Sequence, residues 1–394
     1  MRLLFYISLF LLFSCNTDEE IDISENRVYV TLQGMSHVAI VETNNLQTIE
    51  EVSIDLSDNG MMSAPHDVAV DNVNNFWFTT AMMGGKVGMY SSETNELLSS
   101  FQINQMPALL SIDIDNKTLY VSRGVSGNGI ITNIIYELSY ANGILEEIEK
   151  WDVGFDYAHG IHFDNVSGNL FIVSKTNDFI AKINPNEPQV PFQNPLLISM
   201  DEETTTNHTI PVNRLRPIHI TSKYPYIFIT CSAGEWSSES EYEEIPGQVQ
   251  MWDIESMNLL AVAELGTYSS PWHLDISPIE DKIFISMSGG EGENGSDDSG
   301  VACLQYSNTN DQFYLEEVWQ TKSPNYGEMH GLTVLSDCNG NYYVYASDRT
   351  NGNIYKFDPY TGIELDSKNL MSMDMGTMGN TRTGGIDIYS PCKD

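Results

Sequence analysis

A short sequence motif of alternating apolar and polar residues, which we call the phrase, recurs along this chain with different residues in each copy. It reads HDVAVD at residue 66, HGIHFD at 159, WHLDIS at 272 and HGLTVL at 330, and further copies align at 110, 216 and 385. Successive copies are separated by 44, 49, 57, 56, 58 and 55 residues. Such alternation is typical of a half-buried strand. Short strands that return at a near-constant period predict a β-propeller or a solenoid.

Each copy of the phrase is followed by further apolar runs that short turns separate. From residue 66 onward the chain reads HDVAVD, FWFTTA, KVGMYSS and ELLSSFQI. Four antiparallel strands per unit are typical of a propeller blade. Asn, Asp and Gly occupy the intervening turns, where the backbone often needs a positive φ angle. The seven copies therefore predict an all-β, seven-bladed propeller.

The two ends of the chain complement one another. The strands expected in residues 27–53 lack the phrase, whereas residues 384–391 supply a lone copy, GGIDIYSP. We therefore predict that this last strand joins the N-terminal blade as its innermost strand. That pairing closes the ring and leaves no exposed sheet edge at the junction. The propeller is expected to extend over residues 27–394.

The segment RVYVTLQGMSHVAIVETNNLQTIEEV at residues 27–52 resembles the unit of the YVTN-repeat propeller family. TLYVSRG at 118 and GNIYKFDPYTG at 352 repeat the pattern. The resemblance extends over most of residues 27–390 and implies the seven-bladed propeller fold. Its motifs describe how blades pack and contain no catalytic residue, so it implies no activity.

The N-terminus has the features of an export signal. Residues 1–14 contain one basic residue, Arg2, and an apolar run that is too short to span a bilayer. Leu12-Phe13-Ser14-Cys15 resembles a bacterial lipobox, which implies cleavage before Cys15 and acylation of that residue. Residues 15–26 would then be an acidic tether. We expect a lipoprotein anchored in a bacterial outer membrane, at the cell surface or facing the periplasm.

Charge and cysteine content narrow the partners and the compartment. Lys and Arg number 18 against 55 Asp and Glu, and the net charge of −37 repels nucleic acid and anionic membrane surfaces. We expect a monomer that contacts membrane only through its lipid. Four cysteines follow Cys15 in an oxidising compartment. A disulfide between Cys338 and Cys392 is expected, whereas pairing of Cys231 with Cys303 is left open.

One end of the propeller is the expected binding site, because the loops entering each innermost strand converge there. The aligned first positions of the phrase are His66, Leu110, His159, Arg216, Trp272, His330 and Gly385. Basic residues expected at the same end are Lys86, Arg123, Lys175, Arg216, Arg349 and Arg382. A positive collar on an acidic body would attract an anionic ligand. The candidate ligand-binding residues are His66, His159, Arg216, Trp272, His330, Arg123 and Arg349.

Methionine is concentrated in loops of the same end, in strings such as DNGMMSAPH and TAMMGGK. Thioethers gathered with imidazoles suit Cu(I) outside the cytosol, and imidazole-rich sites suit Cu(II). The candidate metal ligands are His66, His330, Met61, Met62, Met82, Met83 and Met329. The alternative interpretation is an apolar lid or recognition surface, because methionine packs adaptably against many partners.

The leading hypothesis is ligand or partner binding at this mouth without turnover, and copper is its most specific candidate. One alternative is a metal-assisted lyase or hydrolase that uses His159 and His330 as acid and base. Others are a tetrapyrrole-binding redox module and a structural module that binds proteins or glycans. The chain has no Gly-x-Ser-x-Gly motif, and no catalytic residue is assigned.

Overall fold

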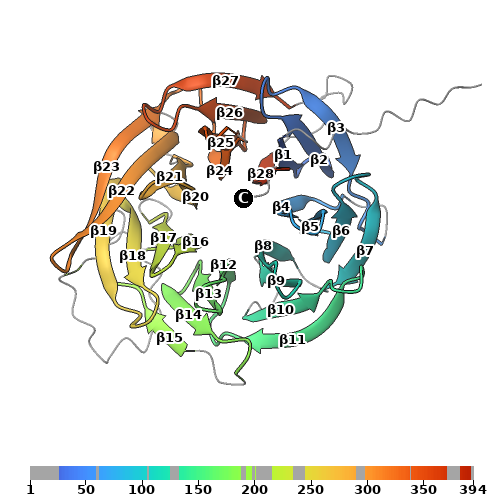
Figure 1. Ribbon diagram of the computed structural model, residues 1–394, viewed down its shortest axis with the longest axis horizontal. Coiled ribbons are helices and arrows are strands. Elements are labelled where there is room, and N and C mark those ends of the chain that lie inside the picture. Colours follow the sequence, from blue (N-terminus) through green and yellow to red (C-terminus); the bar gives the residue numbers. More distant parts are fainter. Residues whose placement is uncertain are drawn as a thin grey trace, which may run out of the picture.

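The computed structural model describes residues 26–391, apart from residues 59–61, 104–105, 125–132, 188–191, 198–199, 201–214, 234–244, 290–297, 338 and 371–381. Every regular element in this part of the chain is a β-strand. The strands form seven four-stranded antiparallel sheets that stand as blades around a ring (Figure 1). The predicted seven-bladed propeller is confirmed.

The blades, each from its innermost to its outermost strand, are as follows. The first four are β28 (Thr383–Tyr389), β1 (Arg27–Leu32), β2 (His37–Glu42), β3 (Thr48–Ser53); β4 (Pro65–Asp71), β5 (Phe76–Ala81), β6 (Lys86–Ser91), β7 (Leu97–Gln102); β8 (Pro107–Asp113), β9 (Thr118–Arg123), β10 (Ile134–Ser139), β11 (Glu146–Asp152); β12 (Ala158–Asp164), β13 (Asn169–Ser174), β14 (Phe179–Ile183), β15 (Phe192–Pro195). The other three are β16 (Pro217–Lys223), β17 (Tyr226–Cys231), β18 (Gly247–Asp253), β19 (Leu259–Gly266); β20 (Pro271–Ile276), β21 (Lys282–Met287), β22 (Gly300–Thr309), β23 (Gln312–Lys322); β24 (Met329–Ser336), β25 (Tyr342–Asp348), β26 (Asn353–Phe357), β27 (Glu364–Asn369).

The ring closes through the C-terminal strand, as the sequence predicts. Strand β28 pairs antiparallel with β1, and Ile386 lies opposite Val30. Ile386 and Ile388 are buried in a hydrophobic cluster that also contains Val28 and Tyr345. The first blade is thus built from both ends of the chain.

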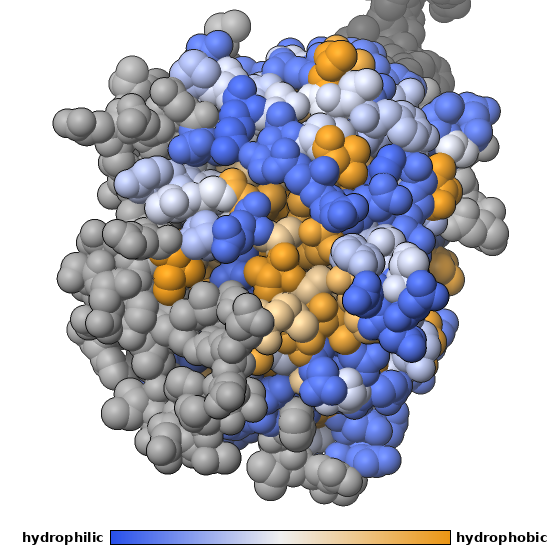
Figure 2. All heavy atoms as spheres, turned by 90° about the vertical axis from the view of Figure 1, so that its left-hand side faces the viewer, coloured by the Kyte–Doolittle hydropathy of each residue, from blue (hydrophilic) through white to orange (hydrophobic). Residues whose placement is uncertain are grey.

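Apolar side chains fill the spaces between neighbouring blades. Phe228 of the fifth blade and Ile285 of the sixth belong to one such cluster, together with Ala263 of β19 and Leu315 of β23. Figure 2 views the ring from the side of β19 and β23 and shows apolar side chains gathered there between hydrophilic ones. Packing between blades holds the innermost strands at fixed positions around the axis.

The innermost strands carry a β-bulge close to their first residue. The strand register shifts after Pro65, Pro107, Ala158, Pro217, Pro271 and Met329. A bulge changes the direction in which the following side chains project. From this register, the positions equivalent to His66 are Ala108, His159, Ile218, Trp272, His330 and Gly384.

The observed register differs from the sequence alignment in three blades. Leu110, Arg216 and Gly385 do not occupy the position equivalent to His66. Leu110 is buried in a hydrophobic cluster between blades, and Arg216 precedes the first residue of β16. Leu110 and Arg216 each lie two residues from the equivalent position, and a shift of two residues leaves an alternating pattern unchanged, so alternation alone could not detect these errors. Gly385 is displaced by one residue.

A repeated hydrogen bond fixes five of these bulges to the preceding blade. A hydroxyl on a second strand donates to the carbonyl of the bulged residue in the next blade. The pairs are Thr31 with His66 (3.2 Å), Thr80 with Ala108 (2.8 Å), Thr230 with Trp272 (2.5 Å), Ser286 with His330 (2.6 Å) and Ser347 with Gly384 (2.9 Å). These bonds set the geometry of the channel mouth.

The question left open about Cys231 and Cys303 is answered by their positions. Both side chains are buried as free thiols, and they belong to different hydrophobic clusters, so they form no disulfide with one another. Cys338, Cys392, the expected signal segment 1–14 and most of the expected tether lie outside the described residues. No helix in the described part of the chain is long and apolar enough to cross a membrane.

Candidate functional site

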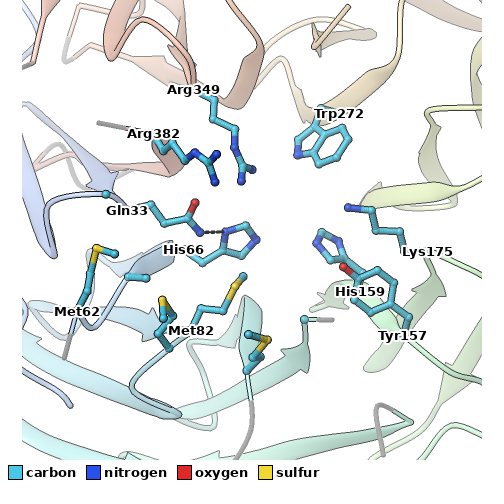
Figure 3. A pocket seen from close by; sticks show the side chains of 15 residues that line it. Gln33, Met62, His66, Met82, Tyr157, His159, Lys175, Trp272, Arg349 and Arg382 are labelled. Carbon is cyan, nitrogen blue, oxygen red and sulfur yellow. Dashed lines mark hydrogen bonds between the residues drawn. The ribbon is translucent and has the colours of Figure 1, made fainter. Parts of the chain in front are cut away.

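The channel mouth contains two adjoining pockets of about 380 and 410 Å³. Both are lined by Lys175, Trp272, Arg349 and Arg382, so they form one continuous space, which we call the mouth cavity. Figure 3 shows the side chains of the first pocket. A volume of this size suits a small-molecule ligand.

Two positions in each blade supply most of the cavity lining. One is the residue or segment just before the innermost strand, and the other is the residue just after the second strand. The backbone N–H of the second position donates to the carbonyl of the first, at 2.7–3.1 Å, in the pairs Gln33 with Arg382, Met82 with Ala64, Gly124 with Met106, Lys175 with Tyr157, and Arg349 with Glu328. The mouth is therefore a rigid, repeated structure.

The backbone at the first of these positions adopts an unusual conformation. Ala64, Tyr157, Arg216, Ser270 and Arg382 have φ angles of 51°, 55°, 49°, 42° and 40°. Residues other than glycine rarely adopt this left-handed conformation, which persists where surrounding contacts enforce it. Its recurrence in five blades shows that the fold imposes it, and it sets the direction of Tyr157 and Arg382 toward the cavity (Figure 3).

Three cationic side chains converge on the cavity. Burial and the positive charges of Arg216 and Arg349 lower the pKa of Lys175 to about 7. Its Nζ lies 4.4 Å from the centre of the Trp272 ring. Among the described residues that line the two pockets, Glu328 is the only carboxylate, and its Oε2 lies 3.9 Å from Nε of Arg349. Arg216 does not line either pocket but acts on Lys175 through its charge.

Histidines form the floor of the cavity. His66, His159 and His330 are all buried, and the ring centre of His66 lies 6.1 Å from that of His159 and 5.8 Å from that of His330. Three of the predicted ligand-binding residues are thus brought together. His273, which the sequence analysis did not select, extends the group with its ring centre 5.1 Å from that of His330.

His66 and His159 carry their protons on different ring nitrogens. The side-chain amide of Gln33 donates to Nδ1 of His66 (2.7 Å), so neutral His66 carries its proton on Nε2, and that buried N–H has no partner among the described residues. Nδ1 of His159 donates to the carbonyl of Ile218 (2.8 Å), which leaves the lone pair on Nε2. The pair thus contains one buried N–H donor, on His66, and one lone-pair acceptor, on His159.

These imidazoles are neutral at pH 7. Burial, and then the positive charge of Lys175, lower the pKa of His159 to about 3. Burial and neighbouring positive groups also hold the pKa values of His66 and His330 well below their ordinary range. A base with a pKa near 3 accepts protons poorly at neutral pH, so His159 is suited to hydrogen bonding more than to proton abstraction.

Four methionines form one side of the cavity, which we call the methionine wall: Met62, Met82, Met83 and Met106. Met62 and Met83 are 44% and 51% exposed. Met82 and Met106 meet beside Gly124, where an added Cβ would lie 3.4 Å from Cε of Met82 and 3.6 Å from Cβ of Met106. An added Cβ would thus make ordinary van der Waals contact with both side chains, which shows that the two methionines flank this position.

Several predicted site residues lie elsewhere. Met329 is fully buried in a hydrophobic cluster with Phe284, because it begins β24 with its side chain between blades. Arg123 is 2% exposed and donates to the carbonyl of Ile103 (3.3 Å), with its guanidinium 5.5 Å from the ring centre of Tyr136. Met61 lies outside the described residues.

The described residues include no group of three or more His, Cys, Asp or Glu side chains arranged to hold a metal ion. A copper site at the mouth would therefore depend on the thioethers of the methionine wall together with His66. Gln33 and Tyr157 are cavity residues that sequence reasoning missed. Each of them occupies one of the two repeated mouth positions, Gln33 just after a second strand and Tyr157 just before an innermost strand. These positions can be recognised only once the ends of the strands are known.

The chain matches no protein-family model and no curated protein. It does resemble solved structures that share its fold. A protein of unknown function from Desulfotomaculum acetoxidans has a TM-score of 0.64 at 13% identity, over 93% of this chain and 99% of that chain. A putative 6-phosphogluconolactonase from Bacteroides fragilis has 0.62 at 13%, over 93% and 98%. A periplasmic gluconolactonase from Pseudomonas aeruginosa has 0.62 at 15%, over 93% and 99%. At these identities the likeness shows the β-propeller fold alone.

Proposed function

We propose that this protein binds a small organic anion in the mouth cavity without turning it over. The observation that carries the proposal is the convergence of Lys175, Arg349 and Arg382 on one cavity of a chain whose net charge is −37. Their mutual repulsion is unfavourable in the free protein and is relieved when an anion binds. Glu328 alone does not balance three cations.

The other polar groups of the cavity can orient such a ligand. Nε2 of His159 can accept from a ligand hydroxyl or amide. The N–H groups of His66 and Trp272 have no partner among the described residues, but both are buried and would reach a ligand only after their side chains move. One structure of similar fold is named as a putative 6-phosphogluconolactonase, and a phosphate-bearing ligand is also an anion. Because the pKa of His159 is about 3, binding suits this cavity better than acid–base catalysis.

Loss of one cavity cation is expected to weaken anion binding about 10- to 100-fold, since charged hydrogen bonds contribute about 1.5–3 kcal/mol. Isothermal titration at pH 6.5 with hexanoate, citrate and 6-phosphogluconate would compare the wild-type protein with Arg349→Gln. The matched control is Lys86→Gln, because Lys86 pairs with Asp58 and does not line the cavity. If no anion of this panel binds, or if both variants behave alike, the proposal is wrong.

The affinity for an anion is expected to fall with rising pH through the titration of Lys175. Its pKa in the free protein is about 7, and a bound anion raises it. Affinity is therefore highest below pH 7 and weakens by up to about tenfold per pH unit above it, until the raised pKa of the complex is reached. Hexanoate titrations from pH 6 to 9 measure this. Lys175→Arg, which stays charged, should remove the trend; a trend unchanged in that variant would contradict the assignment.

Copper is a second candidate ligand, favoured by one observation. His66 and the four thioethers of the methionine wall line the same pocket, and this ligand set suits Cu(I). The positive charges of Lys175 and Arg349 oppose it. His66 must also release its hydrogen bond from Gln33 or move its proton from Nε2 before it can offer a lone pair to the metal. Competition titration of Cu(I) against a chromophoric chelator, with Met82→Ser as the comparison, tests the idea; binding no tighter than micromolar, or equal in the variant, would eliminate it.

We also propose export and lipid anchoring through Cys15, within a propeller of the YVTN-repeat type. The apolar run of residues 1–14 and the Leu-Phe-Ser-Cys motif support this proposal. Replacing Cys15 with serine should release the protein from the outer-membrane fraction of a bacterial host. Unchanged membrane association of that variant would refute anchoring at this residue.

A further inference from the structure

We propose that the anion bound in the mouth cavity is amphipathic, with its charged group among the cations and an apolar body on the methionine wall. This inference rests on the proposed anion-binding function and specifies the class of ligand. In Figure 3, Met62 and Met82 lie on one side of His66, whereas Trp272 and Lys175 lie across the pocket. The cavity therefore has one cationic side and one thioether side.

The methionine wall is held in place by backbone hydrogen bonds. The N–H of Met82 donates to the carbonyl of Ala64 (3.1 Å), and that of Met83 to the carbonyl of Ser63 (3.1 Å). The N–H of Gly124 donates to the carbonyl of Met106 (2.7 Å). Loops from the second and third blades thus present their thioethers from a fixed backbone, while the side chains remain free to adapt. Methionine is well suited to contacting apolar groups of varied shape.

The wall offers a ligand almost no polar partner. The lining of this pocket also includes Gly34, Ala64 and Gly124, none of which has a polar side chain. The neighbouring polar side chain, that of Gln33, already donates its amide N–H to His66. The hydroxyls of a sugar acid placed here would lose hydrogen bonds to water and regain few, which disfavours a polyhydroxylated body. A hydrocarbon body would instead be removed from water together with the exposed thioethers of Met62 and Met83.

The mouth cavity thus favours a carboxylate with an alkyl or aromatic body over a sugar acid of the same length. Each methylene that becomes buried on the wall should tighten binding about three- to fourfold. Trp272 and Tyr157 add aromatic surface on the cationic side, so the body is enclosed from both sides near the charged group. The free space of about 380 Å³ accommodates such an acid.

The test is a titration series at pH 6.5 with acetate, butanoate, hexanoate, octanoate and gluconate. Affinity should rise about three- to fourfold per methylene through the series until the wall is covered. Gluconate, which has the six carbons of hexanoate but carries hydroxyls, should bind at least tenfold more weakly than hexanoate. The double variant Met82→Ser, Met83→Ser should flatten the dependence on chain length while it keeps the affinity for acetate.

Arg349→Gln separates this inference from the proposed function. It should weaken every acid of the series by the same factor and preserve the dependence on chain length. Equal affinities for hexanoate and gluconate, or a chain-length dependence that persists in the double methionine variant, would overturn the amphipathic ligand and leave anion binding intact. Affinities for all the acids that Arg349→Gln leaves unchanged, while the dependence on chain length persists, would overturn anion binding instead. Absence of binding by all five acids would overturn both. Thermal melts of each variant confirm that it is folded.

Discussion

Deletion of residues 383–394 is expected to abolish the cooperative unfolding transition of this protein. The deletion removes β28 and exposes the edge of β1. It also removes Ile386 and Ile388 from the hydrophobic cluster of the first blade, and losing a buried side chain of this size costs about 2–5 kcal/mol. Asp387 accepts the N–H of Val70 in the next blade (2.7 Å), and that bond is lost as well. The sum is comparable to the whole stability of a typical domain, about 5–15 kcal/mol.

Differential scanning calorimetry under reducing conditions measures this effect. The matched control is deletion of residues 392–394 alone, which keeps β28 and, under reducing conditions, takes the expected disulfide at Cys392 out of the comparison. The control should melt close to the full chain, whereas the longer deletion should show no sharp transition. A melt of the longer deletion within a few degrees of the full chain would show that the ring does not depend on closure by β28.

Stability is expected to fall steeply as the pH is lowered below about 6.5. Burial lowers the pKa values of six histidines: His66, His159, His162, His219, His273 and His330. The unfolded chain therefore binds these protons near pH 6.5, whereas the folded chain takes them up only at much lower pH. Each histidine contributes stability that is lost as the pH falls.

Three buried carboxylates act in the opposite direction. Burial raises the pKa values of Asp67 and Asp387 to about 7 and that of Asp275 to about 6. Their folded forms keep protons that the unfolded chain releases near pH 4, so each contributes a cost that grows as the pH rises toward 6 or 7. Around pH 5, six histidines against three carboxylates leave a net uptake of about three protons on unfolding, or about 4 kcal/mol per pH unit.

Melting temperatures between pH 7.5 and 5 in 0.5 M NaCl test this balance, because the salt screens repulsion among the surface carboxylates. We expect a drop of about five degrees per pH unit below pH 6, because the unfolding entropy of a chain of this length is large. His273→Gln should make the slope shallower by one proton, and Asp275→Asn should make it steeper. A melting temperature that is flat or rises toward pH 5, or variants that shift the slope in the other direction, would contradict the assignment of these buried groups.

The architecture could be predicted because its signals are local. Alternation of apolar and polar residues marks a strand, turn residues mark its ends, and a count of recurring units gives the number of blades. The lone copy at residues 384–391 predicted closure by the same logic, and the pairing of Ile386 with Val30 confirms it.

The candidate site could be predicted only in part. Four copies of the phrase are recognisable from their first residue, and that residue lines the mouth cavity in each of them: His66, His159, Trp272 and His330. Arg123 was expected there and instead supports the carbonyl of Ile103 within the core. Met329 begins β24 and Met106 directly precedes β8, yet Met329 belongs to the core whereas Met106 lines the cavity.

The sequence by itself determined the all-β class, the seven blades, the closure of the ring and the acidic character of the molecule, since these follow from short-range patterns and from counts. Only the tertiary structure decided which basic, imidazole and thioether side chains converge. The directions in which these side chains point depend on two backbone features at the start of the innermost strands. One is a β-bulge, and the other is a residue with a positive φ angle. Contacts between residues about forty positions apart enforce both, such as the bond from Thr230 to the carbonyl of Trp272, and no local pattern reports such contacts.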